Sequence, residues 1–338
     1  MLDHRTDHVA WIMRKPRSLG NFSIETSYRT MRDHWPESAS TPHVHTVSRF
    51  TSGIANRLAI WREVRALPHR LIHITGDIHF TAIGLRSKPV VLTIHDLGLL
   101  DEGNAFQRFV KRLFWLTLPL RACDRVIAVS DKTRQDIHSR SGYPVDRIAV
   151  IPSVISPTFR PRQTEPDLPT PRILHIGLAD NKNLDRHAAA IRGLDVHLRI
   201  IGEPSDAQHA MLKDNGIDYS CASKLSEEEL QTEYASASLL LFCSTLEGYG
   251  MPIIEAQTIG VPVITSDRSP MRETAGGGAL LADPDNVEAI RAAVQSVLSG
   301  ETDRSALIDA GHANAKSCSA ARSAELHAEL YRSLLALD

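Results

Sequence analysis

Short apolar runs recur along the whole chain, and stretches of helix length separate them. Most runs contain four to six residues and are apolar on both sides, which favours strands covered on both faces in a parallel sheet. Alternation of such strands with helices predicts right-handed strand–helix–strand units. The first half has Val9–Met13, Val44–Val47, Leu71–Thr75, Val90–Ile94, Val126–Val129 and Ile148–Ile151. The second half has Ile173–Ile176, Val196–Ile201, Leu239–Phe242, Val261–Thr265 and Ala279–Leu281.

A proline-rich stretch separates these two sets of expected strands. Residues 156–171 contain five prolines and little apolar periodicity, which predicts an extended linker because proline fixes φ and lacks a backbone donor. Single cores stop growing near ~250–300 residues, and this chain has 338. We therefore predict an α/β protein with Rossmann-like domains over 1–155 and 172–318. Residues 319–338 carry leucines at helical spacing and predict an amphipathic helix.

The composition is that of a soluble globular protein, with 42% hydrophobic and 23% charged residues. No apolar run approaches the ~18–20 residues of a membrane-spanning helix, and the N-terminal residues do not resemble a signal peptide. The four cysteines lie far apart without a Cys-x-x-Cys spacing. This excludes a zinc ribbon and argues against a disulfide framework. We therefore expect a cytoplasmic protein.

The net charge of −2 conceals two halves of opposite sign. Residues 1–160 contain 23 Lys and Arg against 14 Asp and Glu, whereas residues 161–338 contain 15 against 26. A basic half is compatible with nucleic acid, an anionic membrane surface or a phosphorylated substrate, and also with two surfaces that attract each other across a cleft. The basic residues are scattered and only 5% of residues are aromatic. Nucleic acid is therefore the least favoured partner.

The segment that says most about function follows an expected strand and opens a helix. It is Glu-Gly-Tyr-Gly-Met-Pro-Ile-Ile-Glu-Ala at residues 247–256. Gly248 and Gly250 let the backbone approach a ligand, and the N–H groups of a helix N-terminus attract phosphate. Glu247 and Glu255 would repel phosphate, so they are suited to sugar or ribose hydroxyls. The alternative is a surface loop in which Glu247 favours the helix dipole.

Three further positions follow expected strands, where ligands bind in open α/β sheets. Lys182 could reach a pyrophosphate, and His95 could touch a substrate between the domains. Gly20 lies in the loop after the first strand, where a glycine permits close approach to a ligand. The alternatives are a solvated lysine near a helix start and a structural histidine.

Several signatures of other functions are missing from the sequence. The glycines at 248 and 250 lack the third glycine of a dinucleotide fingerprint, and there is no Walker loop. Ser130 and Ser266 end expected strands without a Gly-x-Ser-x-Gly elbow, which argues against serine hydrolase chemistry. The sixteen histidines show no zinc-site spacing, so we expect no catalytic metal.

Together these motifs resemble the retaining nucleotide-sugar glycosyltransferases of family 4, whose GT-B fold has two Rossmann-like parallel-sheet domains facing each other across a cleft. The family's Glu-x7-Glu motif matches Glu247 and Glu255, and Lys182-Asn183 resembles its Lys-Asn pair. The resemblance covers nearly the whole chain and is strongest over residues 145–300.

The resemblance implies a role for each matched position. Lys182 would neutralise the donor pyrophosphate, Glu247 would bind the donor sugar ring, and Glu255 would bind the ribose. Leu225 would hold the nucleobase through its backbone, and His95 would face the transferred sugar and the acceptor. The other implied donor-binding residues are Gly20, Gly248, Tyr249, Gly250 and Met251, of which Gly20 would approach the pyrophosphate from the other domain. The C-terminal helix would pack back on the first domain.

The chain departs from the family pattern at two places. Ser153-Val154 replaces the usual Asn-Gly after Ile151-Pro152, which alters the turn in the linker but not the site. Leu178 stands where the family often has an arginine, so the second cation for the diphosphate is not identified from the sequence.

The resemblance also implies the reaction. A hexose such as mannose or glucose would pass, with retention and without a metal or resident cofactor, from a nucleoside diphosphate sugar to a glycan or lipid-linked acceptor. The product would be a bacterial cell-surface polysaccharide such as lipopolysaccharide, and the basic half would suit the anionic inner face of the membrane. Two alternatives stay open: a GT-B nucleotide-sugar epimerase, and an inactive nucleotide-sugar-binding subunit.

Overall fold

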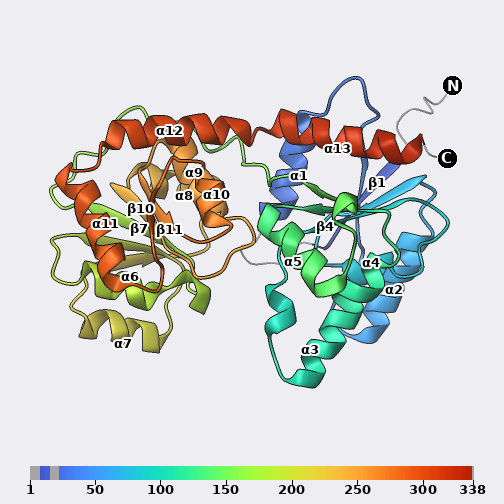
Figure 1. The fold of residues 1–338 in the computed structure, drawn as a ribbon, viewed down its shortest axis with the longest axis horizontal. Helices are drawn as coiled ribbons and strands as arrows, with labels where there is room; N and C mark the ends of the chain where they lie inside the picture. The colour runs from blue at the N-terminus through green and yellow to red at the C-terminus, as the bar shows by residue number, and fades with distance from the viewer. Residues whose placement is uncertain (1–7, 16–22, 337–338) are drawn as a thin grey trace. The chain divides into compact units, whose positions relative to one another are not determined.

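The computed structural model describes residues 8–15 and 23–336 (Figure 1). Within this part the chain forms two compact units. The first unit combines the residues up to Val154 with the C-terminal segment from Ala320, and the second unit runs from Ile155 to Ser319. Each unit contains a six-stranded parallel sheet flanked by helices, which confirms the predicted fold class.

The sheet of the first unit has the strand order β2-β1-β3-β4-β5-β6. Its strands agree with the sequence prediction within two residues: β1 Val9–Met13, β2 His43–Thr46, β3 Leu71–Ile74, β4 Val90–Ile94, β5 Arg125–Ala128 and β6 Ile148–Val150. The helices are α1 Ser23–Asp33, α2 Ile54–Arg65, α3 Ala105–Lys111, a π-helical turn Arg112–Thr117, α4 Leu118–Leu120, α5 Asp131–Ser141 and α13 Ala320–Leu335. Short 3-10 turns occupy His79–Ala82, Gly98–Asp101 and Val145–Arg147.

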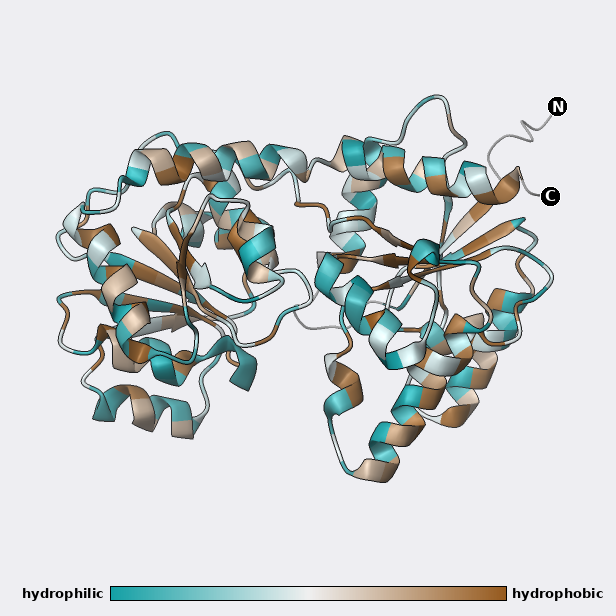
Figure 2. Ribbon diagram, viewed as in Figure 1, coloured by the Kyte–Doolittle hydropathy of each residue, from teal (hydrophilic) through white to brown (hydrophobic). Residues whose placement is uncertain are grey.

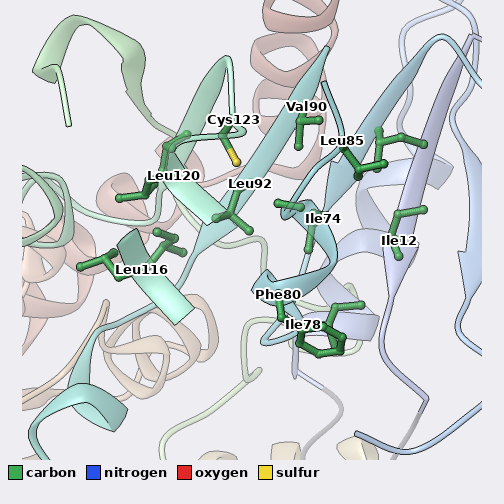
Figure 3. Packing of buried hydrophobic residues seen from close by; sticks show 14 of the residues in the cluster. Ile12, Ile74, Ile78, Phe80, Leu85, Val90, Leu92, Leu116, Leu120 and Cys123 are labelled. Atoms are coloured by element: carbon green, nitrogen blue, oxygen red, sulfur yellow. The ribbon is translucent and has the colours of Figure 1, made fainter. Parts of the chain in front are cut away.

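Both faces of this sheet are buried. Ile74 and Leu92 belong to a cluster that includes Leu116 from the π-helical turn (Figure 3). Trp11 and Val91 belong to a second cluster, and because successive strand residues point to opposite faces, this cluster lies on the other side of the sheet. Burial on both faces explains why the strands are continuous apolar runs in the sequence, as Figure 2 shows by their colour.

Helix α13 covers the face that carries Trp11. It packs beside α1, and its Ala324, Tyr331 and Leu334 are buried. The Trp11 indole N–H donates a hydrogen bond to the Tyr331 hydroxyl at 2.8 Å. The apolar side of this helix is therefore part of the core of the first unit.

The sheet of the second unit has the strand order β12-β11-β10-β7-β8-β9. Its strands are β7 Arg172–Ile176, β8 His197–Ile201, β9 Tyr219–Ala222, β10 Leu239–Phe242, β11 Val263–Ser266 and β12 Leu280–Ala282. The helices are α6 Leu184–Ile191, α7 Asp206–Asp214, α8 Glu227–Ala235, α9 Met251–Ile259, α10 Met271–Ala275, α11 Val287–Ser299 and α12 Arg304–Ser317, with a 3-10 turn at Asp180–Lys182.

The strand prediction is wrong at one place, because it omits β9. This strand lies at an edge of the sheet. Its residues are half-buried except for Cys221, which is exposed. A partly exposed strand needs no continuous apolar run, so the hydrophobic pattern does not mark it.

The strand order of the second unit reverses between β7 and β10. From β7 the chain continues through β8 to β9 at one edge, then returns to β10 beside β7 and proceeds to β12 at the other edge. Open α/β sheets bind ligands at the carboxyl ends of the strands at such a reversal. The loops that follow β7 and β10 are therefore the expected place for a site.

The proline-rich stretch runs along the second unit. Residues 156–171 form no helix or strand, as their composition predicts, but they do not form a free linker. The buried Phe159 ring meets the Tyr234 ring edge-on, with 5.9 Å between the centroids. The Arg162 backbone N–H donates to the Ile259 carbonyl at 2.9 Å. The segment is thus anchored to the domain that it precedes.

Candidate active site

Hydrogen bonds join the loops after β7 and β10 to each other. The Asn181 side chain donates to the Leu246 carbonyl at 2.7 Å, and the Thr245 backbone N–H donates to the Asn181 carbonyl at 2.8 Å. The buried Asn183 side chain donates to the Cys243 carbonyl at 2.9 Å and the Pro284 carbonyl at 2.7 Å. These bonds fix the two loops relative to each other without a ligand.

Asn183 also adopts a left-handed backbone conformation, with φ of 65°. Asparagine tolerates this conformation better than most residues. Its side-chain oxygen accepts a hydrogen bond from Arg186 at 2.8 Å. The sharp turn at Asn183 places Lys182 on the loop immediately before helix α6.

Lys182 and Glu247 form an ion pair at this reversal point. The Lys182 Nζ atom lies 2.5 Å from Glu247 Oε1, and the two side chains are 21% and 13% exposed. The ammonium also lies 5.0 Å from the centroid of the Phe242 ring. The structure therefore brings together Lys182 and Glu247, which the sequence singled out, and pairs their opposite charges.

Gly177 makes room for this lysine. A Cβ atom at Gly177 would lie 3.1 Å from both Cγ and Cε of Lys182, and the residue has a φ of +87°. Both the contact and the backbone conformation favour glycine.

The N-terminus of helix α9 lies on the same loop as Glu247. Gly250 is the N-cap of this helix, with φ of 102°, and has no side chain with which to cap it. In the first turn Pro252 has no N–H, and the Ile253 N–H already donates to the Gly250 carbonyl at 3.0 Å. The Met251 N–H, together with the positive end of the helix dipole, is therefore the candidate donor for an anion. Gly248 belongs to the bend before this helix. The Tyr249 carbonyl accepts from the Thr274 hydroxyl at 2.7 Å, while the Tyr249 hydroxyl lies 3.1 Å from Cys318 Sγ.

Glu255 lies in helix α9 and is already hydrogen-bonded. The Tyr234 hydroxyl of helix α8 donates to Glu255 Oε2 at 2.6 Å. Burial raises the pKa of Glu255 to about 7, although the Tyr234 hydrogen bond opposes the shift. A buried carboxyl group with a strongly raised pKa is typical of functional sites. Leu225 lies in the loop between β9 and α8, and Tyr234 near the end of α8 bonds to Glu255. Helix α8 therefore links Leu225 and Glu255, the two positions predicted to hold the nucleoside.

The sequence matches two families that together span most of the chain. Residues 159–313 match the family described as glycosyl transferases group 1, and residues 21–159 match glycosyltransferase family 4. The chain belongs to the group 1 glycosyltransferases. This confirms the family that the motifs resembled, and with it the prediction of an enzyme.

Relatives of this glycosyltransferase include two mannosyltransferases. The O-antigen chain mannosyltransferase B of Escherichia coli is 27% identical over 256 residues, which cover 68% of this chain and 67% of that protein. The O-antigen chain mannosyltransferase RfbU of Salmonella typhimurium is 25% identical over 227 residues, covering 65% and 63%. The match thus spans about two thirds of each relative's length. These relatives support the hexosyltransferase type.

Solved structures establish the fold of the glycosyltransferase as GT-B. The Anabaena protein HepE in complex with UDP and glucose gives a TM-score of 0.78 at 16% identity, over 97% of this chain and 100% of that one. Sucrose-phosphate synthase from Thermosynechococcus elongatus also gives 0.78, at 17% identity, over 98% and 100%.

Leu178, which departs from the family pattern, is half-buried and packs against the core of the second unit. Its side chain lies over Gly202 and against the buried core. A cation that the sequence prediction missed lies on a neighbouring loop: Arg268, after β11, donates to the Thr245 carbonyl at 3.3 Å and pairs with Asp285 at 2.6 Å. Its partner carbonyl belongs to the loop that carries Glu247.

Of the two site residues predicted in the first domain, His95 and Gly20, the structure describes only His95. The His95 Nε2–H group donates to the Thr75 carbonyl at 3.0 Å, and burial lowers the pKa of His95. His95 is therefore a neutral imidazole at the carboxyl end of β4, with Nδ1 as an acceptor. Gly20 lies outside the described residues.

In residues 8–15 and 23–336, no group of three or more His, Cys, Asp and Glu side chains is placed to hold a metal ion. Independence from metal stays a prediction.

Proposed function

We propose that the chain transfers a hexose, mannose or glucose, from a nucleoside diphosphate sugar to a glycan or lipid-linked acceptor of a bacterial cell-surface polysaccharide. The O-antigen mannosyltransferases among the relatives and the UDP complexes of HepE support this substrate class. The observation that carries the proposal is the Lys182–Glu247 pair on the loops beside the N-terminus of helix α9.

The chemistry requires charge stabilisation at the leaving group. When the glycosidic bond breaks, negative charge develops on the nucleoside diphosphate. Lys182 and the N-terminus of helix α9, with the Met251 N–H, would stabilise that charge. A diphosphate carries more charge than a carboxylate, so it would draw Lys182 away from Glu247. Glu247 would then be free to accept hydrogen bonds from the donor sugar. Retention of the anomeric configuration is part of the proposal and follows from the family resemblance.

A transfer assay tests this function. The protein is incubated with GDP-mannose or UDP-glucose, with and without a lipid-linked oligosaccharide fraction, and the product linkage is read by NMR. We expect acceptor-dependent transfer with the anomeric configuration of the donor. Isomerised donor in the absence of acceptor would instead identify an epimerase, and binding without turnover an inactive subunit.

We further propose that the first domain contacts an anionic membrane surface. Among the described residues no helix is long and apolar enough to cross a bilayer. Helix α3 and the π-helical turn after it present an aromatic–basic surface. Phe106, Phe109 and Phe114 are 74%, 63% and 43% exposed. The same stretch, residues 105–117, contains three basic residues and no acidic one.

Exposed phenylalanines next to cations suit the interface of an anionic bilayer. The rings can enter the boundary between headgroups and acyl chains, while Arg and Lys contribute about 1 kcal/mol each near anionic lipid. Helix α3 is exposed or half-exposed along its whole length, and Figure 2 shows it banded in polar and apolar colours.

Sedimentation with vesicles tests the membrane contact. We expect binding to vesicles that contain phosphatidylglycerol and little binding to pure phosphatidylcholine. The double substitution Phe106→Ser and Phe109→Ser removes the binding, whereas Ile54→Ser, at a 77% exposed position of helix α2, leaves it unchanged. Equal binding by all three proteins, or equal binding to both lipids, contradicts the proposal.

A further inference from the structure

Two buried histidines connect the loops that carry Lys182 and Glu247. His175 of β7 and His187 of α6 are 1% and 0% exposed. Their Nδ1 atoms lie 2.9 Å apart. At one end, His175 Nε2 lies 2.8 Å from the Gly177 carbonyl oxygen, and at the other, His187 Nε2 lies 3.2 Å from the Cys243 backbone nitrogen. The two rings therefore form a continuous hydrogen-bonded bridge.

The end groups determine the direction of every hydrogen bond in this bridge. The Cys243 backbone N–H can only donate, so His187 Nε2 is an acceptor and the proton of His187 is on Nδ1. That proton is donated to His175 Nδ1, and the proton of His175 must then be on Nε2. There it is donated to the Gly177 carbonyl, which can only accept. This order of donors and acceptors requires two neutral rings, because one extra proton would leave two N–H donors facing each other in one of the hydrogen bonds.

Both rings are neutral near pH 7. Burial, with a smaller contribution from the nearby Lys182 ammonium, lowers the pKa of His175 to about 4, although the hydrogen bond to the Gly177 carbonyl opposes the shift. Burial also holds the pKa of His187 well below its usual value.

The bridge joins the first residue of each site loop. Gly177 directly follows β7, and the Lys182 side chain lies against it. Cys243 directly follows β10, four residues before Glu247. Asn181 and Asn183 join the same loops farther along the chain, so the bridge fixes the positions at which the loops leave the sheet.

An apolar core would be the simpler way to fill this space. Two buried imidazoles cost free energy of desolvation, and that cost is recovered only through complete hydrogen bonding. A leucine at 187 would fill similar volume but would leave the Cys243 N–H without its ring acceptor. The pair is thus suited to holding two backbone segments in register.

We propose that His175 and His187 are positioning residues that hold Lys182 and Glu247 in the geometry required for the nucleoside diphosphate. The inference rests on the proposed function and deepens it. Neither ring touches the substrate; both act through the backbone at Gly177 and Cys243.

The proton order is tested first, and without any ligand. Long-range 1H–15N NMR of the histidine rings distinguishes the two neutral tautomers. We expect His187 protonated on Nδ1 and His175 protonated on Nε2. Any other combination of tautomers contradicts the bridge.

The positioning role is tested with variants at His187. His187→Gln keeps one acceptor and one donor, whereas His187→Leu keeps neither. His327→Leu is the matched control, since His327 is 3% exposed in α13 and its ring bonds to a carbonyl of its own helix. Dissociation constants are measured for whichever of UDP, GDP and ADP binds the wild-type protein most tightly. Melting temperatures and transfer rates are measured in parallel.

We expect His187→Leu to weaken nucleotide binding roughly 3–30-fold, the range typical of coupling through a positioned network. His187→Gln restores binding to within a few fold of wild type. Lys182→Ala, added to His187→Leu, weakens binding less than it does in the wild type, because the lysine is already misplaced. His327→Leu lowers the melting temperature without changing the dissociation constant.

Two outcomes separate the inference from the proposed function. If His187→Leu is folded and binds nucleotide as tightly as wild type, the pair is a core feature only and the inference fails. If the wild-type protein binds none of the three nucleotides, the proposed function fails and the positioning role falls with it, whatever tautomers the NMR shows.

Discussion

Both units have a six-stranded parallel sheet whose strand order reverses once, but they put different chemistry at the reversal. In the first unit the reversal lies between β1 and β3, and Arg14 follows β1. Arg14 lies 3.0 Å from Glu25 and 3.3 Å from Asp77, so two carboxylates surround one cation. In the second unit Lys182 pairs, among the described residues, with one carboxylate, Glu247, beside the start of helix α9, whose N-cap Gly250 has no side chain.

This difference shows that the fold supplies the location and the side chains supply the function. A cation between two carboxylates has little charge left for an anionic ligand. A cation with one carboxylate partner, next to the positive end of a helix, gains when a diphosphate replaces that partner. The second unit is therefore the side on which we expect the nucleotide.

The largest effect is expected when the cation of the second unit, Lys182, is removed. Lys182→Ala lowers kcat/KM of transfer by about 100-fold or more, the usual cost of removing one group that stabilises developing charge. Arg14→Ala lowers the melting temperature but leaves nucleotide affinity within a few fold, because its charge is balanced by Glu25 and Asp77. Steady-state kinetics and nucleotide titration of both variants make the comparison. Equal loss of nucleotide affinity in both would remove the distinction between the units.

A smaller and more selective effect is expected at the carboxylate partner. Glu247→Gln lowers transfer by about 10–100-fold, as expected for loss of a charged hydrogen-bond partner of the reacting sugar. Nucleoside diphosphate binding is unchanged or tighter, because Lys182 no longer has to leave an ion pair. Isothermal titration beside the transfer assay measures both quantities. Weaker nucleotide binding in this variant would show that the pair does not compete with the ligand.

The smallest expected effect is on the free energy of unfolding, and it tests whether the carboxyl pKa of Glu255 is raised in the folded protein. Its carboxyl pKa is raised from 4.5 to about 7 in the folded protein. The folded state therefore binds more protons than the unfolded state between these values, and this group lowers the free energy of unfolding as pH rises through that window. At pH 8 the cost is complete, whereas below pH 4.5 it is absent.

Glu255→Gln removes this cost while keeping an acceptor for the Tyr234 hydroxyl. We expect the variant to be about 1–3 kcal/mol more stable than wild type at pH 8, with a smaller difference at pH 5, on the scale of 1.36 kcal/mol per pKa unit. Donor KM rises at the same time if Glu255 holds the ribose. Urea unfolding at the two pH values measures the effect, and a gain that does not depend on pH would show that the carboxyl is not the cause.

The sequence predicted the sheets because strands buried on both faces are continuous apolar runs. It predicted Lys182 and Glu247 because loops that follow such strands meet at one edge of a sheet. It could not predict their ion pair, since the two residues are 65 positions apart and meet only because β10 returns beside β7.

The half-exposed β9 and the His175–His187 bridge were missed for related reasons. β9 lacks the apolar pattern, and the bridge depends on a contact between a strand and a helix. One signal was available: His175 interrupts the apolar strand Arg172–Ile176 directly before Gly177. A polar side chain in a buried strand needs a partner, but the sequence does not say which.

Thermal unfolding with UDP, GDP and ADP, each at millimolar concentration with and without magnesium, tests the central claim that the second unit holds a nucleoside diphosphate. Ligand that binds only the folded state raises the melting temperature in proportion to ln(1 + [L]/Kd). We predict a shift with one nucleotide that does not require magnesium and is much smaller in Lys182→Ala than in Arg14→Ala. No shift with any nucleotide, or a full shift in Lys182→Ala, would contradict the account.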